Sequence, residues 1–203
     1  DLDGTLTNPK PGILNCVRHA LAELDEPCPP EDDLLWFIGP PLRESFQTLL
    51  NCTEAEAEEA VRIYRERFGT IGLLENDVFE GVPEMLEAQS AADKRLFIAS
   101  TKPHVYIHPI LEHFDLKNWF ERIYGSELDG TRAVKTDLLH YIFAELDLDP
   151  EITVMIGDRV HDMAAAKAVG VTSIWVDYGY GDEAERDAAK PDHICSSIAE
   201  LAA

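Results

Sequence analysis

The sequence is poor in positive charge and has no long apolar segment. Seventeen lysines and arginines stand against 39 aspartates and glutamates, so the formal net charge is −22 at pH 7. Nucleic-acid binding needs basic side chains that replace phosphate counterions, which argues against a nucleic-acid partner. No run approaches the roughly 20 apolar residues that a membrane helix requires. We therefore expect no nucleic-acid or membrane partner and, because no basic-then-apolar leader opens the sequence, a cytoplasmic location.

Cysteines are few, and their spacing is not that of a disulfide or zinc framework. The four residues Cys16, Cys28, Cys52 and Cys195 form no CxxC pair and no metal-like spacing with histidine. In a chain of 203 residues this usage predicts free, reduced thiols rather than a redox site.

The apolar pattern changes near residue 75. Residues from roughly 10 to 75 are predicted to be helical, and "NCTEAEAEEAVRIYRERFG" is the clearest helix, with Thr53 and Glu56 as a capping box. Beyond this point, short apolar strands such as "RLFIAS" and "ITVMIGD" alternate with helices. That alternation predicts a parallel sheet covered by helices on both faces.

Polar side chains follow several of these predicted strands. The two aspartates of "DLDGT" lie where a strand would have just ended, and Lys135 begins a helix after a strand. Because the carboxyl ends of parallel strands meet at one edge of a sheet, we expect all these groups to gather there. The expected set is Asp1, Asp3, Ser100, Thr101, Lys102, Lys135, Asp158 and Asp162.

This set suits phosphoryl chemistry. Carboxylates from Asp1, Asp3 and Asp158 form a hard, oxygen-rich site of the kind that Mg²⁺ prefers. Ser100 and Lys135 add a hydroxyl donor and a cation, and the backbone around a glycine can approach an anion closely. One aspartate could attack phosphorus while the metal shields its charge, and the other could move the proton.

Each piece alone has an ordinary explanation. "DLDGT" could be a turn, although a calcium loop is disfavoured because no glutamate stands at the twelfth position. Ser100 or Thr101 could cap a helix that begins near Pro103, and Lys135 could be a solvated surface lysine. Four such pieces in order, each at a strand end, are hard to obtain by chance, which favours the functional interpretation.

With these motifs in place, the sequence resembles the haloacid dehalogenase-like hydrolase superfamily over nearly its whole length. "DLDGT" resembles its first motif, "FIAST" its second, Lys135 its third and "IGDRVHDMAAAKAVGV" its fourth. The resemblance implies that Asp1 is a nucleophile that forms an aspartyl-phosphate and that Asp3 is the acid and base. It also implies Mg²⁺ bound by Asp1, the Asp3 carbonyl and Asp158, with Asp162 supporting the metal or orienting Lys135.

The same resemblance implies the remaining contacts and the fold. Ser100 and Lys135 would bind phosphoryl oxygens, and further substrate contacts are expected from Gly4, Thr5, Thr101, Lys102 and Arg43. For Arg43, a solvated arginine at a helix start is an equal alternative, and Tyr178 and Tyr180 either line a loop near the site or only pack.

The resemblance also implies an α/β fold class. Residues 1–9 and 76–203 are expected to form a Rossmann-like three-layer core with a parallel sheet, and residues 10–75 an inserted all-helical cap of the C1 type. The family places an apolar strand before "DLDGT", and we expect that strand in the full polypeptide.

The sequence also discriminates among activities of this superfamily. The dehalogenases of the superfamily lack the second aspartate of the first motif, which this chain has as Asp3. Phosphonatases use a lysine in the cap, but this chain has no lysine between Lys10 and Lys94. Sugar-phosphate mutases commonly have glutamate before the aspartate of the fourth motif, where this chain has Gly157. These features favour the phosphoglycolate phosphatase-like or 5′-nucleotidase-like branch. We expect a monomer or weak dimer that hydrolyses a small phosphorylated metabolite, 2-phosphoglycolate-like or a nucleoside 5′-monophosphate. The alternatives are a sugar phosphomutase and a non-catalytic phosphate- or partner-binding module.

Overall fold

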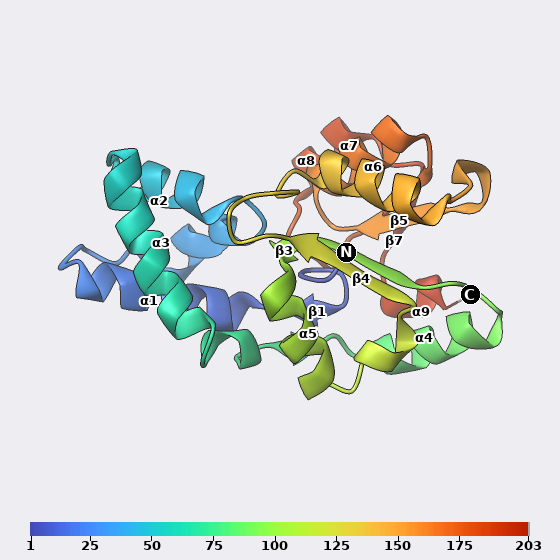
Figure 1. Ribbon diagram of the computed structural model, residues 1–203, viewed down its shortest axis with the longest axis horizontal. Coiled ribbons are helices and arrows are strands. Elements are labelled where there is room, and N and C mark those ends of the chain that lie inside the picture. The colour runs from blue at the N-terminus through green and yellow to red at the C-terminus, as the bar shows by residue number, and fades with distance from the viewer. Residues whose placement is uncertain (203) are drawn as a thin grey trace. The chain divides into compact units, whose positions relative to one another are not determined.

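The structure is a computed structural model that describes residues 1–202, and it separates into two compact units (Figure 1). One unit comprises Asp1–Thr7 with Val78–Ala203, and the other comprises Asn8–Asp77. The chain passes between them through two short strands, β1 (Thr7–Asn8) and β2 (Asp77–Val78), which pair with each other. The domain boundaries predicted from the sequence, at residues 9–10 and 75–76, lie close to these crossings.

The unit Asn8–Asp77 is helical. It contains the helices α1 (Lys10–Glu23), α2 (Leu42–Leu50) and α3 (Glu54–Phe68), with 3-10 turns η1 (Glu31–Phe37) and η2 (Gly72–Leu74). Helix α3 begins with the predicted capping box, in which Thr53 Oγ1 accepts from the Glu56 N–H and the Glu56 carboxylate accepts from the Thr53 N–H at 2.8 Å. Both α1 and α2 pack against α3.

The other unit contains five parallel strands in two groups. Strands β3 (Phe97–Pro103) and β4 (Arg122–Ser126) pair with each other, and β5 (Val154–Gly157), β6 (Thr172–Val176) and β7 (His193–Cys195) form the second group. The Asp1 backbone nitrogen donates to the Ile156 carbonyl at 2.8 Å, and the Asp3 side chain pairs with Lys102 of β3. Residues 1–3 therefore lie between the two groups of strands.

Helices cover both faces of these strands, as the alternating pattern predicts (Figure 1). Ile98 packs with α4 (Val82–Ala91), α5 (His104–His113) and α9 (Ile198–Leu201). Its neighbour Ala99 packs with α6 (Lys135–Leu146) and α7 (Val160–Val169). Because successive side chains of a strand point to opposite faces, this division produces three layers. The remaining turns are η3 (Lys117–Trp119) and η4 (Pro150–Ile152).

Two local features differ from the sequence-based expectation. The pattern did not predict α8 (Glu183–Ala189), which has no buried residue and therefore no apolar periodicity. Its start depends instead on Asp182, whose side chain accepts from the Glu185 N–H at 2.7 Å. The alternative in which Ser100 or Thr101 caps a helix is wrong, because β3 continues through both residues to Pro103.

None of the helices in the described part of the chain, residues 1–202, combines the length and apolar character needed to cross a membrane.

Candidate active site

The two aspartates of "DLDGT" stand on a tight turn built around Leu2. The Leu2 side chain is fully buried, and its carbonyl accepts from the N–H groups of Thr5, Leu6 and Thr7 at 3.2, 2.8 and 3.0 Å. Gly4 has φ +81°, and a Cβ atom there would lie 2.1 Å from Asp158 Oδ2. Glycine is therefore required twice, by the backbone angle and by the close approach of the carboxylate.

Lys135 joins two of the predicted site residues. Its Nζ lies 2.8 Å from Asp1 Oδ1 and 2.7 Å from Asp162 Oδ1, and the lysine is almost completely buried at the start of α6. A buried ammonium between two carboxylates offsets their mutual repulsion. The solvated-lysine alternative for this residue is wrong.

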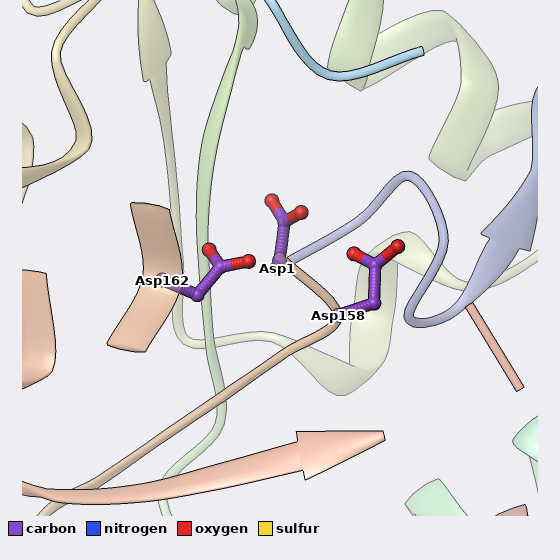
Figure 2. Close-up of side chains that lie close together, drawn as sticks. All are labelled: Asp1, Asp158 and Asp162. Carbon is purple, nitrogen blue, oxygen red and sulfur yellow. The ribbon is translucent and has the colours of Figure 1, made fainter. Parts of the chain in front are cut away.

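Asp1, Asp158 and Asp162 form one carboxylate cluster, which is drawn in Figure 2. They come from the N-terminal segment, the turn after β5 and the first turn of α7, and one oxygen from each lies within 4.8 Å of the others. Burial, reinforced by the charge of Asp162, raises the pKa of Asp158 to about 7. Burial acts to raise the pKa of Asp162, but the nearby positive charges, Lys135 first among them, and hydrogen bonds from Lys135 and the Arg159 N–H together outweigh it, and that pKa lies below its ordinary value.

The loop after β6 closes around Asp158. The Tyr180 N–H donates to Asp158 Oδ2 at 2.7 Å, and a Cβ on Gly179 would lie 2.2 Å from the Asp158 Cβ. A Cβ on Gly181 would lie 2.2 Å from the Asp158 carbonyl oxygen. The sequence analysis named Tyr178 and Tyr180 of "DYGYGD" but not the two glycines. Their alternation with the tyrosines, just after a predicted strand, was the signal that could have indicated them.

The cluster fits a divalent cation. Asp158 Oδ1 is buried and has no hydrogen-bond partner among residues 1–202, an arrangement that is costly unless another group supplies the interaction. Three carboxylates so close together form the oxygen-only donor set that hard cations prefer. The predicted metal set was Asp1, Asp3, Asp158 and Asp162, and this cluster contains the carboxylates of Asp1, Asp158 and Asp162. Asp3 was predicted to bind through its backbone carbonyl, and that ligand stays a prediction.

Asp3 is instead held by Lys102. The Lys102 Nζ lies 2.5 Å from Asp3 Oδ2, with the lysine buried at the end of β3. The Lys102 N–H donates to Ser100 Oγ at 3.3 Å, which places the buried Ser100 hydroxyl in the same stretch of strand. Sequence reasoning assigned Lys102 to the substrate and did not anticipate this ion pair.

Thr5, Thr101 and Arg43 were also predicted to contact the substrate. The Thr5 carbonyl accepts from the Tyr178 hydroxyl at 3.0 Å, and the Thr101 carbonyl accepts from Ser126 Oγ at 2.7 Å. Arg43 lies on α2 in the other unit, where it pairs with Glu54 at 3.1 Å and with Glu58. Substrate contacts from these residues stay predictions.

Comparison with known proteins places the chain in one family. A model of the family described as haloacid dehalogenase-like hydrolase matches residues 1–176. A solved structure of a predicted phosphatase from Clostridium acetobutylicum superimposes with a TM-score of 0.94 at 37% sequence identity. The alignment covers 100% of this chain and 94% of that one.

Three curated relatives carry different activity names. A 5′-nucleotidase of Pseudomonas aeruginosa is 46% identical over 201 residues, 99% of this chain and 91% of that protein. The tyrosine-protein kinase PtkA of Mycobacterium tuberculosis is 38% identical over 181 residues, 89% of this chain but only 62% of that protein. A phosphoglycolate phosphatase of Colwellia psychrerythraea is 29% identical over 188 residues, 89% of this chain and 83% of that protein.

Proposed function

The chain belongs to the haloacid dehalogenase-like hydrolase family, and from that premise we propose that it is a Mg²⁺-dependent phosphatase acting through an aspartyl-phosphate. The proposed substrate is a small phosphate monoester, 2-phosphoglycolate-like or a nucleoside 5′-monophosphate. The relatives named 5′-nucleotidase and phosphoglycolate phosphatase support this class of enzyme. A cytoplasmic location and a monomeric or weakly dimeric state stay predictions.

The observation that carries the proposal is the environment of Asp1. Its carboxylate is mostly buried, held by Lys135 at 2.8 Å, and clustered with Asp158 and Asp162. A carboxylate attacks an anionic phosphoryl group only where cations offset the repulsion between them. Lys135 supplies one positive charge on this chain, and the cluster is a donor set for a second.

Asp1, Asp158 and, through its backbone carbonyl, Asp3 are the proposed ligands of Mg²⁺, with Asp162 supporting them or orienting Lys135. When bound, Mg²⁺ supplies positive charge that offsets the charge of the phosphoryl oxygens.

The proposed reaction has two displacements. An Asp1 carboxylate oxygen attacks phosphorus, the ester P–O bond breaks, and the departing alkoxide takes a proton from Asp3. A water molecule then attacks the same phosphorus and gives its proton to Asp3, while the bond between Asp1 and phosphorus breaks. Inorganic phosphate leaves, and both aspartates return to their starting forms.

Lys102 has a proposed part in this cycle. Its ammonium lies 2.5 Å from the Asp3 carboxylate and holds that side chain in place. An incoming phosphoryl group offers Lys102 a competing anionic partner. When the ammonium turns toward the phosphoryl oxygens, it releases the Asp3 side chain to face the leaving group.

The test is phosphate release from a panel of monoesters, with Mg²⁺ and with a chelator. The panel contains 2-phosphoglycolate, nucleoside 5′-monophosphates, sugar phosphates and a chromogenic aryl phosphate. Asp1→Asn is expected to lower kcat by about 10³-fold or more with the fold intact, because it removes the nucleophile. Asp187→Asn, which changes an exposed aspartate, serves as the matched control and should keep full activity.

Each other outcome has a defined meaning. Full activity of Asp1→Asn would refute the covalent mechanism. Turnover only with a bisphosphate activator would point to a sugar phosphomutase, and tight phosphate binding without turnover to a binding module.

A further inference from the structure

A pair of histidines on α5 lies outside the carboxylate cluster. His104 is the first residue of α5 and His108 follows one turn later, and both side chains are half-buried. Their Nε2 atoms lie 3.0 Å apart, with ring centroids at 4.5 Å and the ring planes at 69°. The two nitrogens therefore face each other rather than pointing apart.

Two imidazoles at positions i and i+4 of a helix are a known arrangement for binding a divalent metal. Taking metal–nitrogen bonds of about 2.0–2.1 Å, a separation of 3.0 Å between the nitrogens corresponds to a ligand–metal–ligand angle of roughly 90–97°. Adjacent ligands of a square-planar or tetragonal ion stand at about 90°, whereas tetrahedral Zn²⁺ prefers about 109°. The geometry thus favours Ni²⁺ or Cu²⁺ over Zn²⁺.

The surroundings permit a cation at this position. His104 borders a cavity of about 280 Å³ whose charged lining residues are two arginines and two glutamates, Arg122, Arg132, Glu127 and Glu145. Arg132 pairs with Glu127 at 2.5 Å and also lies over the Tyr141 ring, so a carboxylate offsets its charge. Glu112, one helical turn after His108 on α5, pairs with Lys117 at 2.5 Å.

The protonation state of His108 also agrees. Two imidazolium groups cannot face each other at 3.0 Å without strong repulsion. Burial, together with the charge of His104, lowers the pKa of His108, so His108 is readily neutral near pH 7. Neutral imidazole is the form that binds metals.

From this geometry we propose that His104 and His108 form a second metal site, which binds one Ni²⁺ or Cu²⁺ ion with water completing its coordination. It differs in chemistry from the carboxylate cluster, because imidazole nitrogen suits late first-row ions and carboxylate oxygen suits Mg²⁺. The proposal does not depend on the phosphatase activity.

The experiment measures Ni²⁺ binding by equilibrium dialysis, in excess Mg²⁺ and on protein without a histidine tag. All proteins in the experiment carry Asp158→Asn, and the protein with this substitution alone is called the background protein. The substitution removes a carboxylate from the other cluster, so that Ni²⁺ bound there is not counted with Ni²⁺ bound by the histidines. This background protein is expected to bind one Ni²⁺ per chain. Either His104→Gln or His108→Gln should weaken that binding by more than about tenfold, because each removes one of the two protein ligands.

His113→Gln is the matched control, because His113 is exposed on the same helix and contacts Phe114 instead of a second histidine. It should bind Ni²⁺ as the background protein does. Equal Ni²⁺ affinity in the background protein and in both His104→Gln and His108→Gln would overturn the proposal, as would no bound Ni²⁺ in the background protein.

A second measurement does not depend on the folding of the histidine variants. Cu²⁺ added to the background protein is examined by electron paramagnetic resonance. Hyperfine splitting from two nitrogen nuclei is the expected result. A spectrum with oxygen ligands alone would mean that the 3.0 Å contact is only a hydrogen bond between the rings.

Discussion

Replacement of Lys135 by methionine tests how the carboxylate cluster is stabilised. Its Nζ lies 2.8 Å from Asp1 and 2.7 Å from Asp162. At these distances each attraction is roughly 6 kcal/mol at an effective dielectric constant of about 20. The variant does not lose this full amount, because an unpaired carboxylate can take up a proton. At pH 7 that uptake costs roughly 4 kcal/mol for a carboxyl group with an ordinary pKa of about 4.

We therefore expect Lys135→Met to lower the free energy of unfolding by about 3–4 kcal/mol at pH 7, in the range for one-sided removal of a buried ion pair. The loss should depend on pH. In the folded variant the unpaired carboxyl has a raised pKa, so above about pH 4 the folded state binds more protons than the unfolded state, and stability falls as pH rises. In the parent, Asp162 has a lowered pKa, so its stabilisation is lost as pH falls below about 4, and the difference between the two proteins should shrink further there.

The assay is urea unfolding of both proteins at several pH values, with a chelator and with Mg²⁺. Because a bound cation replaces part of the lost positive charge, Mg²⁺ should stabilise the variant more than the parent. Lys117→Met is the matched control, since it removes a lysine from an exposed pair with Glu112 and should cost less than about 1 kcal/mol. Equal stability of Lys135→Met and the parent in chelator at pH 7 would falsify this account of the cluster.

Three other predictions concern different parts of the chain. The pKa of Asp158 is raised to about 7, so its contribution to the free energy of unfolding is present below about pH 4 and is lost as pH rises to about 7. Asp158→Asn should remove this pH dependence, as measured by urea unfolding in the presence of a chelator. Gly179→Ala places a methyl group within 2.2 Å of the Asp158 Cβ and should reduce phosphatase activity by about tenfold or more. Glu75→Gln breaks a two-bond pair with Arg67, at 2.6 and 2.9 Å, and should lower the free energy of unfolding by about 1 kcal/mol at pH 7. Because Arg67 lowers the pKa of Glu75, this stabilisation is present above the ordinary carboxyl pKa, and the variant's deficit should shrink as pH falls below about 4.

The sequence by itself determined the family and the layered α/β class, and both predictions are confirmed. The predicted enzyme class, phosphoric monoester hydrolase, is confirmed at the level of the family and of the relatives' names. These features could be predicted from the sequence because they depend on residues that are close together in the chain. Strand and helix periods repeat within one segment, and a motif such as "DLDGT" keeps its chemistry at fixed spacing.

The capping box at Thr53 was readable for the same reason, since its two hydrogen bonds join residues three positions apart. Its geometry needs no information from elsewhere in the chain.

Only the tertiary structure decided the pairings inside the site. Lys102 and Asp3 are 99 positions apart, and Lys135 lies 134 positions from Asp1, so the identity of each partner depends on how the strands and helices pack. The same holds for Gly179, whose missing side chain matters only because Asp158 lies against it. A sequence pattern can indicate that charged groups will share one edge of a sheet. Which ammonium neutralises which carboxylate is decided by distances of a few ångströms, and these exist only once the core has packed.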